Sequence, residues 1–264
     1  MELKITNNYN PDSVIDRIGI LLSGGLDSVA GFYNLCNELI RQDKLDVTIV
    51  PFHYVDTQYP VTESIVNDVV TTVKASFPSV TISDAKIFNF DLDYVIHRMG
   101  WTCLNMAERD QKFDEYVQSN DIENVVNFRT MLPPREVWKK WSLYAAGEPE
   151  GGTGKLNGRR TITGLADTRN TPHPEYVRKD SYSVYSPYAA KTKMYVKEMF
   201  NEYNVPERFV DDTRSCTRVM RKPITNHKPR PDTFPIDHPD FDGTAGACGE
   251  CYHCWEKKWA FGKI

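Results

Sequence analysis

Residues 18–28 read Ile-Gly-Ile-Leu-Leu-Ser-Gly-Gly-Leu-Asp-Ser, and this stretch decides the fold. Its first five residues form a short apolar run that is typical of a buried strand. From Val29 onward, apolar residues recur at helical spacing. The chain therefore changes from strand to helix across residues 23–28. The two glycines in that turn allow a ligand to approach the backbone closely.

This strand-to-helix turn predicts a binding site for phosphate. The first N–H groups of a helix have no partner within the helix, and the helix dipole favours negative charge there. The alternative is that Asp27 or Ser28 merely caps the helix. The turn lacks the lysine of a Walker loop and the third glycine of a dinucleotide-binding loop. The residues predicted to form the phosphate loop are Leu22, Ser23, Gly24, Gly25, Leu26, Asp27 and Ser28.

The composition is that of a folded protein. Of the 264 residues, 40% are hydrophobic and 12% aromatic, which is ample for a packed core. No apolar run approaches the ~20 residues that span a bilayer, and no signal-peptide pattern is visible, so we expect a cytoplasmic protein without a membrane partner. The net charge of −4 argues against a surface devoted to nucleic acid. A homodimer is compatible with this composition.

The first ninety residues alternate strand and helix signals. Strands are predicted over residues 18–22, 47–54 and 80–88, with helices from residue 29 and over residues 62–75. This rhythm predicts a parallel sheet with helices packed on it. Ligands of such sheets bind at the carboxyl ends of the strands, where residues 23–28 lie.

The rest of the chain is patterned less strongly. Residues 91–120 are predicted to be helical, residues 125–128 form a short apolar run, and residues 161–165 are predicted to be another core strand. Helices are also predicted over residues 133–146 and 189–203. The residues of the last helix that are predicted to face inward are Met194, Met199, Phe200 and Tyr203.

Cysteines near the end of the chain predict a metal site. Cys248, Cys251 and Cys254 follow one another at intervals of three residues, and Cys216 precedes them. Tetrahedral zinc takes four such thiolates, and disulfides are rare in cytoplasmic proteins. An iron–sulfur cluster is the rival, but Lys258 stands where a ferredoxin run has its fourth cysteine. We therefore predict structural Zn²⁺.

Two further expectations concern the C-terminal part. The chain divides into residues 1–205, which bind the nucleotide, and residues 206–264, a zinc-binding segment packed on them. Residues 213–231 carry six basic side chains and no acidic one. This basic segment either binds phosphates of a nucleotide or nucleic acid, or is a solvated loop that balances acidic neighbours.

The Ser-Gly-Gly-Leu-Asp-Ser loop resembles the pyrophosphate loop of the PP-loop ATP pyrophosphatases. Together with the cysteine-rich tail, it makes the chain resemble the 7-cyano-7-deazaguanine synthase family. The resemblance implies an α/β fold with a Rossmann-like parallel sheet of the PP-loop (adenine nucleotide alpha hydrolase-like) type and a C-terminal zinc-binding appendage. Other residues that carry it are 52–54, Arg129, 162–165 with Asp167, and Ser186-Pro187 shortly before Lys191.

The resemblance also implies a reaction. Members of the family convert 7-carboxy-7-deazaguanine, ammonia and ATP into the nitrile preQ0, which serves deazaguanine modification of nucleic acids, and the implied cofactors are ATP, Mg²⁺ and Zn²⁺. Three residues have a structural alternative to a role in this reaction. Lys191 would then be a surface lysine, Arg129 a partner in a structural ion pair, and Asp167 the cap of a turn. The candidate catalytic residues are Asp27, Ser28, Lys191, Arg129 and Asp167.

The chain departs from the family pattern near the expected substrate pocket. Residues 55–59 differ from the usual stretch after the second strand, and Phe128 replaces a glycine. The product therefore stays open between a nitrile, an amide and a conjugate with a macromolecule. A tRNA-modifying PP-loop ATPase or an amidotransferase is the rival, although each would be expected to bring an additional domain.

Overall fold

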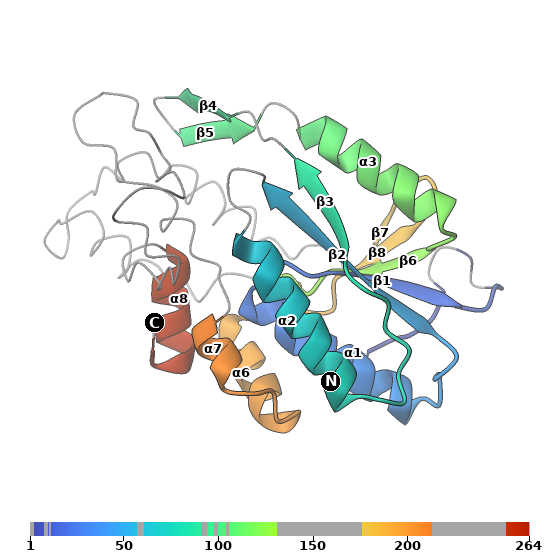
Figure 1. Ribbon diagram of the computed structural model, residues 1–264, viewed down its shortest axis with the longest axis horizontal. Coiled ribbons are helices and arrows are strands. Elements are labelled where there is room, and N and C mark those ends of the chain that lie inside the picture. The colour runs from blue at the N-terminus through green and yellow to red at the C-terminus, as the bar shows by residue number, and fades with distance from the viewer. Residues whose placement is uncertain are drawn as a thin grey trace, which may run out of the picture.

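The computed structural model describes residues 3–7, 10, 12–56, 61–90, 94–97, 100–103, 106–130, 176–212 and 252–263. These residues include a six-stranded sheet in the order β3-β2-β1-β6-β8-β7 (Figure 1). Neighbouring strands are parallel except β7, which pairs antiparallel with β8. The predicted α/β fold with a mostly parallel sheet is confirmed. The strands are β1 (Arg17–Leu21), β2 (Thr48–Asp56), β3 (Lys86–Phe90), β6 (Asn124–Val126), β7 (Tyr176–Arg178) and β8 (Ser183–Tyr185).

Helices cover both faces of this sheet (Figure 1). On one face, α1 (Leu26–Arg41), α2 (Val61–Ser76) and α6 (Lys193–Glu202) bury the larger apolar core. On the other, α3 (Met106–Ser119) covers a smaller core that is rich in phenylalanine. The short helix α7 (Arg208–Asp212) contacts α1, and α8 (Tyr252–Phe261) packs against α6.

The side chains of β1 alternate between the two apolar cores, as expected of a strand in the middle of the sheet. Ile18 and Ile20 point into the larger core, whereas Gly19 lies under the Phe52 ring of the smaller core. In α1, the residues that recur every three or four positions are fully buried, including Val29 and Phe32. This pattern holds α1 against the sheet directly behind the predicted phosphate loop.

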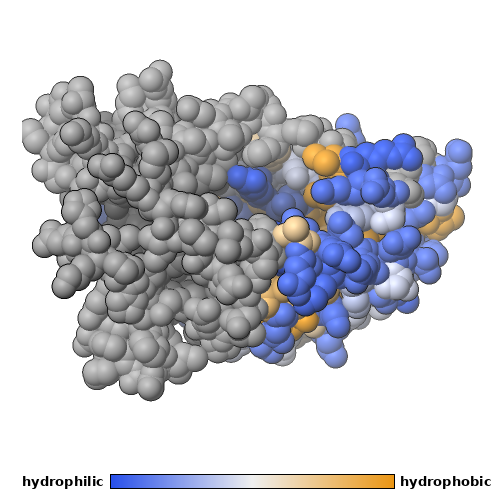
Figure 2. Space-filling model, turned by 90° about the horizontal axis from the view of Figure 1, so that it is seen from above, coloured by the Kyte–Doolittle hydropathy of each residue, from blue (hydrophilic) through white to orange (hydrophobic). Residues whose placement is uncertain are grey.

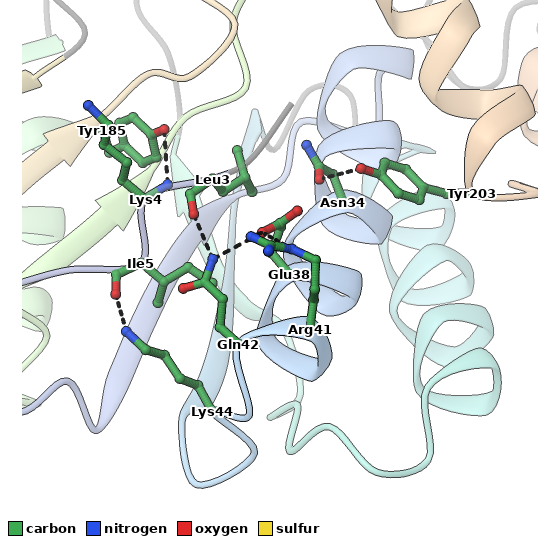
Figure 3. A network of polar contacts seen from close by, with 10 residues as sticks. All are labelled: Leu3, Lys4, Ile5, Asn34, Glu38, Arg41, Gln42, Lys44, Tyr185 and Tyr203. Atoms are coloured by element: carbon green, nitrogen blue, oxygen red, sulfur yellow. Dashed lines mark hydrogen bonds and ion pairs between the residues drawn. The ribbon is translucent and has the colours of Figure 1, made fainter.

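Polar contacts tie α1 to distant parts of the chain (Figure 3). The buried amide of Asn34 donates from Nδ2 to the Tyr188 hydroxyl at 3.0 Å and accepts from the Tyr203 hydroxyl at 2.9 Å. After the helix, Gln42 Nε2 donates to the Leu3 carbonyl at 2.8 Å, and Lys44 Nζ donates to the Ile5 carbonyl. The N-terminal segment and α6 are thereby fixed to the helix that follows the loop.

Most predicted elements in the first ninety residues are confirmed, although the third strand begins at Lys86 and not at residue 80. The stretch 91–120 is only partly helical. A hairpin of β4 (Tyr94–His97) and β5 (Gly100–Cys103) precedes α3. Aromatic and β-branched residues in this stretch favour strands, which outweighs its weak helical pattern. Cys103 therefore lies in a strand and not in a helix. The predicted elements over residues 133–146 and 161–165 lie outside the described residues.

The predicted helix over residues 189–203 starts later than expected. Thr192 is its N-cap and Lys193 its first residue. Met199 and Phe200 are buried as predicted, but Met194 is 38% exposed, so its inward placement was wrong. Met194 lies off the inward face of α6 by one residue, and this face consists of Lys193, Val196, Met199 and Phe200.

Among the described residues, the face shown in Figure 2 carries small hydrophobic patches that are separated by hydrophilic residues. Exposed large hydrophobic side chains such as Val14 and Leu45 come from different elements and loops. Among the described residues, no helix is both long enough and apolar enough to cross a membrane.

Candidate active site

The loop between β1 and α1 is shaped by its own serines. Ser28 Oγ accepts a hydrogen bond from the Ser23 backbone N–H at 3.2 Å and donates to the Gly25 carbonyl at 2.9 Å. The Gly25 N–H in turn donates to Ser23 Oγ at 3.3 Å. Gly25 is the N-cap of α1, so the first N–H groups of the helix open at the end of this loop. The arrangement suits an anion.

Gly24 is the residue that makes the turn. Its φ of +73° lies in the left-handed region, where a side chain is strained. A Cβ at this position would lie 3.5 Å from both Ile65 and Val66 of α2. By contrast, the side chains of Leu22 and Leu26 are buried in the core, so these two residues offer a ligand only their backbone.

A cavity of about 390 Å³ opens beside the loop, at the carboxyl ends of β1, β2 and β6. This position agrees with the general rule for ligands of parallel sheets, and the volume is in the usual range for small-molecule sites. The lining residues include Ser23, Asp27 and Ser28 from the loop region, Phe52, His53 and Tyr54 from β2, and Asn127, Phe128 and Arg129 after β6.

His53, at the wall of this cavity, joins three parts of the chain. Its Nδ1 lies 2.8 Å from the Leu22 carbonyl and its Nε2 lies 3.0 Å from Thr62 Oγ1. Burial lowers the pKa of His53 to about 4, although the hydrogen bond to Leu22 opposes this shift. The ring is therefore neutral near pH 7. It donates from Nδ1 to the carbonyl and accepts from Thr62 at Nε2, which fixes the start of the loop to β2 and α2.

Asp27 is held on two sides. Its Oδ1 lies 2.5 Å from Lys193 Nζ, and its Oδ2 accepts a hydrogen bond from Thr130 Oγ1 at 2.8 Å. Lys193 is 5% exposed, and its Nζ lies 3.9 Å from Glu256 Oε2 of α8. The sequence pattern did not reveal Lys193, Thr130 or Glu256. No signal in the sequence marked Lys193, because the helix was predicted to begin at residue 189 and only the structure places Lys193 at its first position.

The candidate residues divide into three groups. Asp27, Ser28 and Arg129 all line the cavity, and Arg129 is exposed. Lys191 lies elsewhere, with its Nζ 5.2 Å from the centre of the Tyr195 ring, and Lys193 takes the place beside Asp27. Asp167 lies outside the described residues.

The predicted metal site also falls mostly outside the described part of the chain. Cys216, Cys248 and Cys251 lie beyond it, and of Cys254 only the place in α8 is described. Among the described residues, no group of three His, Cys, Asp or Glu side chains could hold a metal ion. Zinc binding therefore stays a prediction, as does any role of the basic segment 213–231. Cys36 is buried, as expected of a small apolar residue, and burial raises the pKa of its thiol.

Comparison with known proteins identifies no family. No family model and no curated protein matches the sequence. Among solved structures, a similar one is the U34-tRNA thiolase NcsA from Methanococcus maripaludis with its 4Fe-4S cluster. It shares 10% sequence identity at a TM-score of 0.43, and the match covers 75% of this chain and 60% of that chain. Such a distant likeness identifies neither substrate nor cofactor, so both have to be inferred from the residues of the site.

Proposed function

We propose that the protein is an ATP-dependent ligase of the PP-loop ATP pyrophosphatase type that converts 7-carboxy-7-deazaguanine and ammonia into the nitrile preQ0. The observation that carries this proposal is the glycine–serine loop of residues 23–28, which opens onto a cavity at the carboxyl ends of parallel strands. A phosphate chain in this loop meets the N–H groups of α1 and the positive end of its dipole.

The cavity has two chemically different sides around the loop. On the β2 side, Tyr54 and the neutral ring of His53 line the cavity without a charge, which suits a flat nucleoside base. On the β6 side, Arg129 offers a guanidinium that suits a carboxylate or a phosphate. ATP and a carboxylate substrate would thus meet across the phosphate loop.

Asp27 is the residue that fits a magnesium ion. Mg²⁺ is usually held by one or two carboxylates together with substrate phosphates, and Asp27 supplies a carboxylate at the wall of the cavity. When bound, the ion would neutralise charge that develops on the phosphates. Lys193, which already pairs with Asp27, brings a further cation to the same place.

The reaction needs two activations of one carboxyl group. A carboxylate oxygen attacks the α-phosphorus of ATP and pyrophosphate leaves; ammonia then displaces AMP to give the amide. The amide oxygen attacks a second ATP, and loss of AMP and a proton from the adenylated amide leaves the nitrile. Fixed cations such as Arg129 and Lys193 would stabilise the charge on each leaving pyrophosphate.

The products decide between this reaction and its rivals. Full-length protein is incubated with ATP, ammonium and 7-carboxy-7-deazaguanine, and the products are resolved by mass while AMP is counted. A nitrile with two AMP per molecule supports the proposal. An amide with one AMP, a conjugate to a macromolecular amine, or AMP formation that requires tRNA would overturn it. Asp27→Asn, which keeps the size of the side chain but removes its charge, is the matched control and should form little AMP.

A further inference from the structure

A short row of charged side chains, Asp27, Lys193 and Glu256, leads from the phosphate loop into the protein, and the last two are buried. Lys193 is 5% exposed and Glu256 is 1% exposed. Lys193 Nζ lies 2.5 Å from Asp27 Oδ1 and 3.9 Å from Glu256 Oε2. Because the three residues come from α1, α6 and α8, the row joins three helices. The rings of Phe200 and Phe261, 5.4 Å apart between centroids, pack α8 against α6 beside it.

The position of Lys193 is electrostatically unfavourable by itself. It is the first residue of α6, where the helix dipole presents partial positive charge, and burial removes its ammonium group from water. Asp27 and Glu256 supply the negative charge that compensates for both effects. Asp27 lines the cavity, whereas Lys193 and Glu256 are not among the described residues that line it, so Lys193 meets the site through its contact with Asp27.

We propose that Glu256 is a positioning residue that holds Lys193 Nζ at the edge of the phosphate loop, so that the C-terminal helix α8 is a working part of the phosphate site. The inference rests on the proposed function, because it requires an anion in the loop. An ammonium group has three donors. With carboxylates on two sides, Nζ stays between α1 and α8 and keeps a donor for a phosphate oxygen.

Charge by itself predicts the opposite effect. Replacing Glu256 with glutamine removes a negative charge 3.9 Å from Nζ, and a pure change of field would strengthen the attraction of an anion. Loss of the anchor instead lets Nζ settle on Asp27, which weakens its contact with phosphate. The two accounts therefore predict opposite changes in the affinity for an anion when Glu256 is replaced by glutamine.

The test is a calorimetric titration of the full-length protein with inorganic pyrophosphate and, separately, with adenosine. Glu256→Gln should raise the Kd for pyrophosphate about tenfold, as expected for coupled charged groups in contact, and leave the adenosine affinity unchanged. In a Lys193→Gln background, Glu256→Gln should have no further effect. The control is Lys263→Gln, which breaks the exposed ion pairs with Glu207 and Asp211 just after α8 and should change neither affinity.

Each other outcome counts against the proposal. Unchanged or tighter pyrophosphate binding in Glu256→Gln refutes the positioning role, and so does an equal additional loss in the Lys193→Gln background. If Glu256→Gln does not fold, Glu256→Asp keeps the charge on a shorter side chain and should show a smaller loss of the same selectivity for pyrophosphate. A wild-type protein that binds no pyrophosphate refutes both proposals, whereas binding that Glu256 does not affect refutes this one alone.

Discussion

Gly31 lies in the middle of α1. Its replacement by alanine should change the free energy of unfolding in the direction opposite to that expected from helix propensity. Alanine in a helix interior normally adds about 1 kcal/mol of stability relative to glycine. Here a Cβ would lie 1.9 Å from Phe128 Cγ and 2.2 Å from Phe128 Cδ2. Ordinary contact begins at 3.4 Å, so the ring would have to retreat by 3.4 − 1.9 Å, or about 1.5 Å. The Phe128 ring therefore occupies the space that a side chain at position 31 would need.

The ring has little room to retreat. Phe128 is 1% exposed, and its centroid lies 4.9 Å from that of the fully buried Tyr188. Overpacking of this kind costs about 1–3 kcal/mol, so we expect Gly31→Ala to lower the free energy of unfolding. Phe128 also lines the cavity next to Arg129, so the same change should displace the guanidinium and reduce activity.

Urea unfolding measures this effect through a lower midpoint at an unchanged m-value. The control is the same substitution in a Phe128→Ala background, where the clash is gone and alanine should stabilise the helix again. A higher midpoint for Gly31→Ala alone would show that helix propensity dominates and would refute the reasoning. So would equal effects in the two backgrounds.

Three other results are expected. Gly24→Val should abolish pyrophosphate release in a protein that still folds, because φ is +73° there; undiminished release would contradict this. Unfolded His53 takes up a proton near pH 6.5 and folded His53 only near pH 4, so stability should fall by up to about 3 kcal/mol as the pH drops through that window. His53→Gln should remove this slope in a urea unfolding series, and an unaltered slope would assign it to other groups. Cys251→Ser should lose a bound zinc ion in metal analysis; iron with acid-labile sulfide in the wild-type protein would point to a cluster instead.

Local signals in the sequence were sufficient for the part of the fold that carries the loop. Strand β1, the glycine turn and α1 are continuous in the chain, so their apolar periods and their glycines predict them directly. Strands β7 and β8 have only three residues each, too few to show an alternation, and they were not predicted. Short strands of this kind are fixed by their partners in the sheet.

The site likewise contains residues that the local sequence indicates and residues that only distant contacts bring in. Asp27 and Ser28 belong to the loop motif, so the sequence indicates them. Lys193 meets Asp27 across 166 positions of the chain, and no local pattern records such a meeting. Lys191 was favoured for its place after Ser186-Pro187, but only the start of α6 determines which of the two lysines turns toward α1.

The two hydrogen bonds of Asn34 have a consequence for the order in which the protein is made. Their partners, Tyr188 and Tyr203, are synthesised more than 150 residues after Asn34 itself. Strands β1, β2, β3 and β6 are all complete by residue 126, so a nascent chain can pair them. At that length the chain does not yet contain α6, which packs on α1. During this interval the amide of Asn34 is solvated by water and the apolar residues around it are open to chaperones. Closure of α1 is thus a late step in folding, because it requires residues up to Tyr203 to have been synthesised.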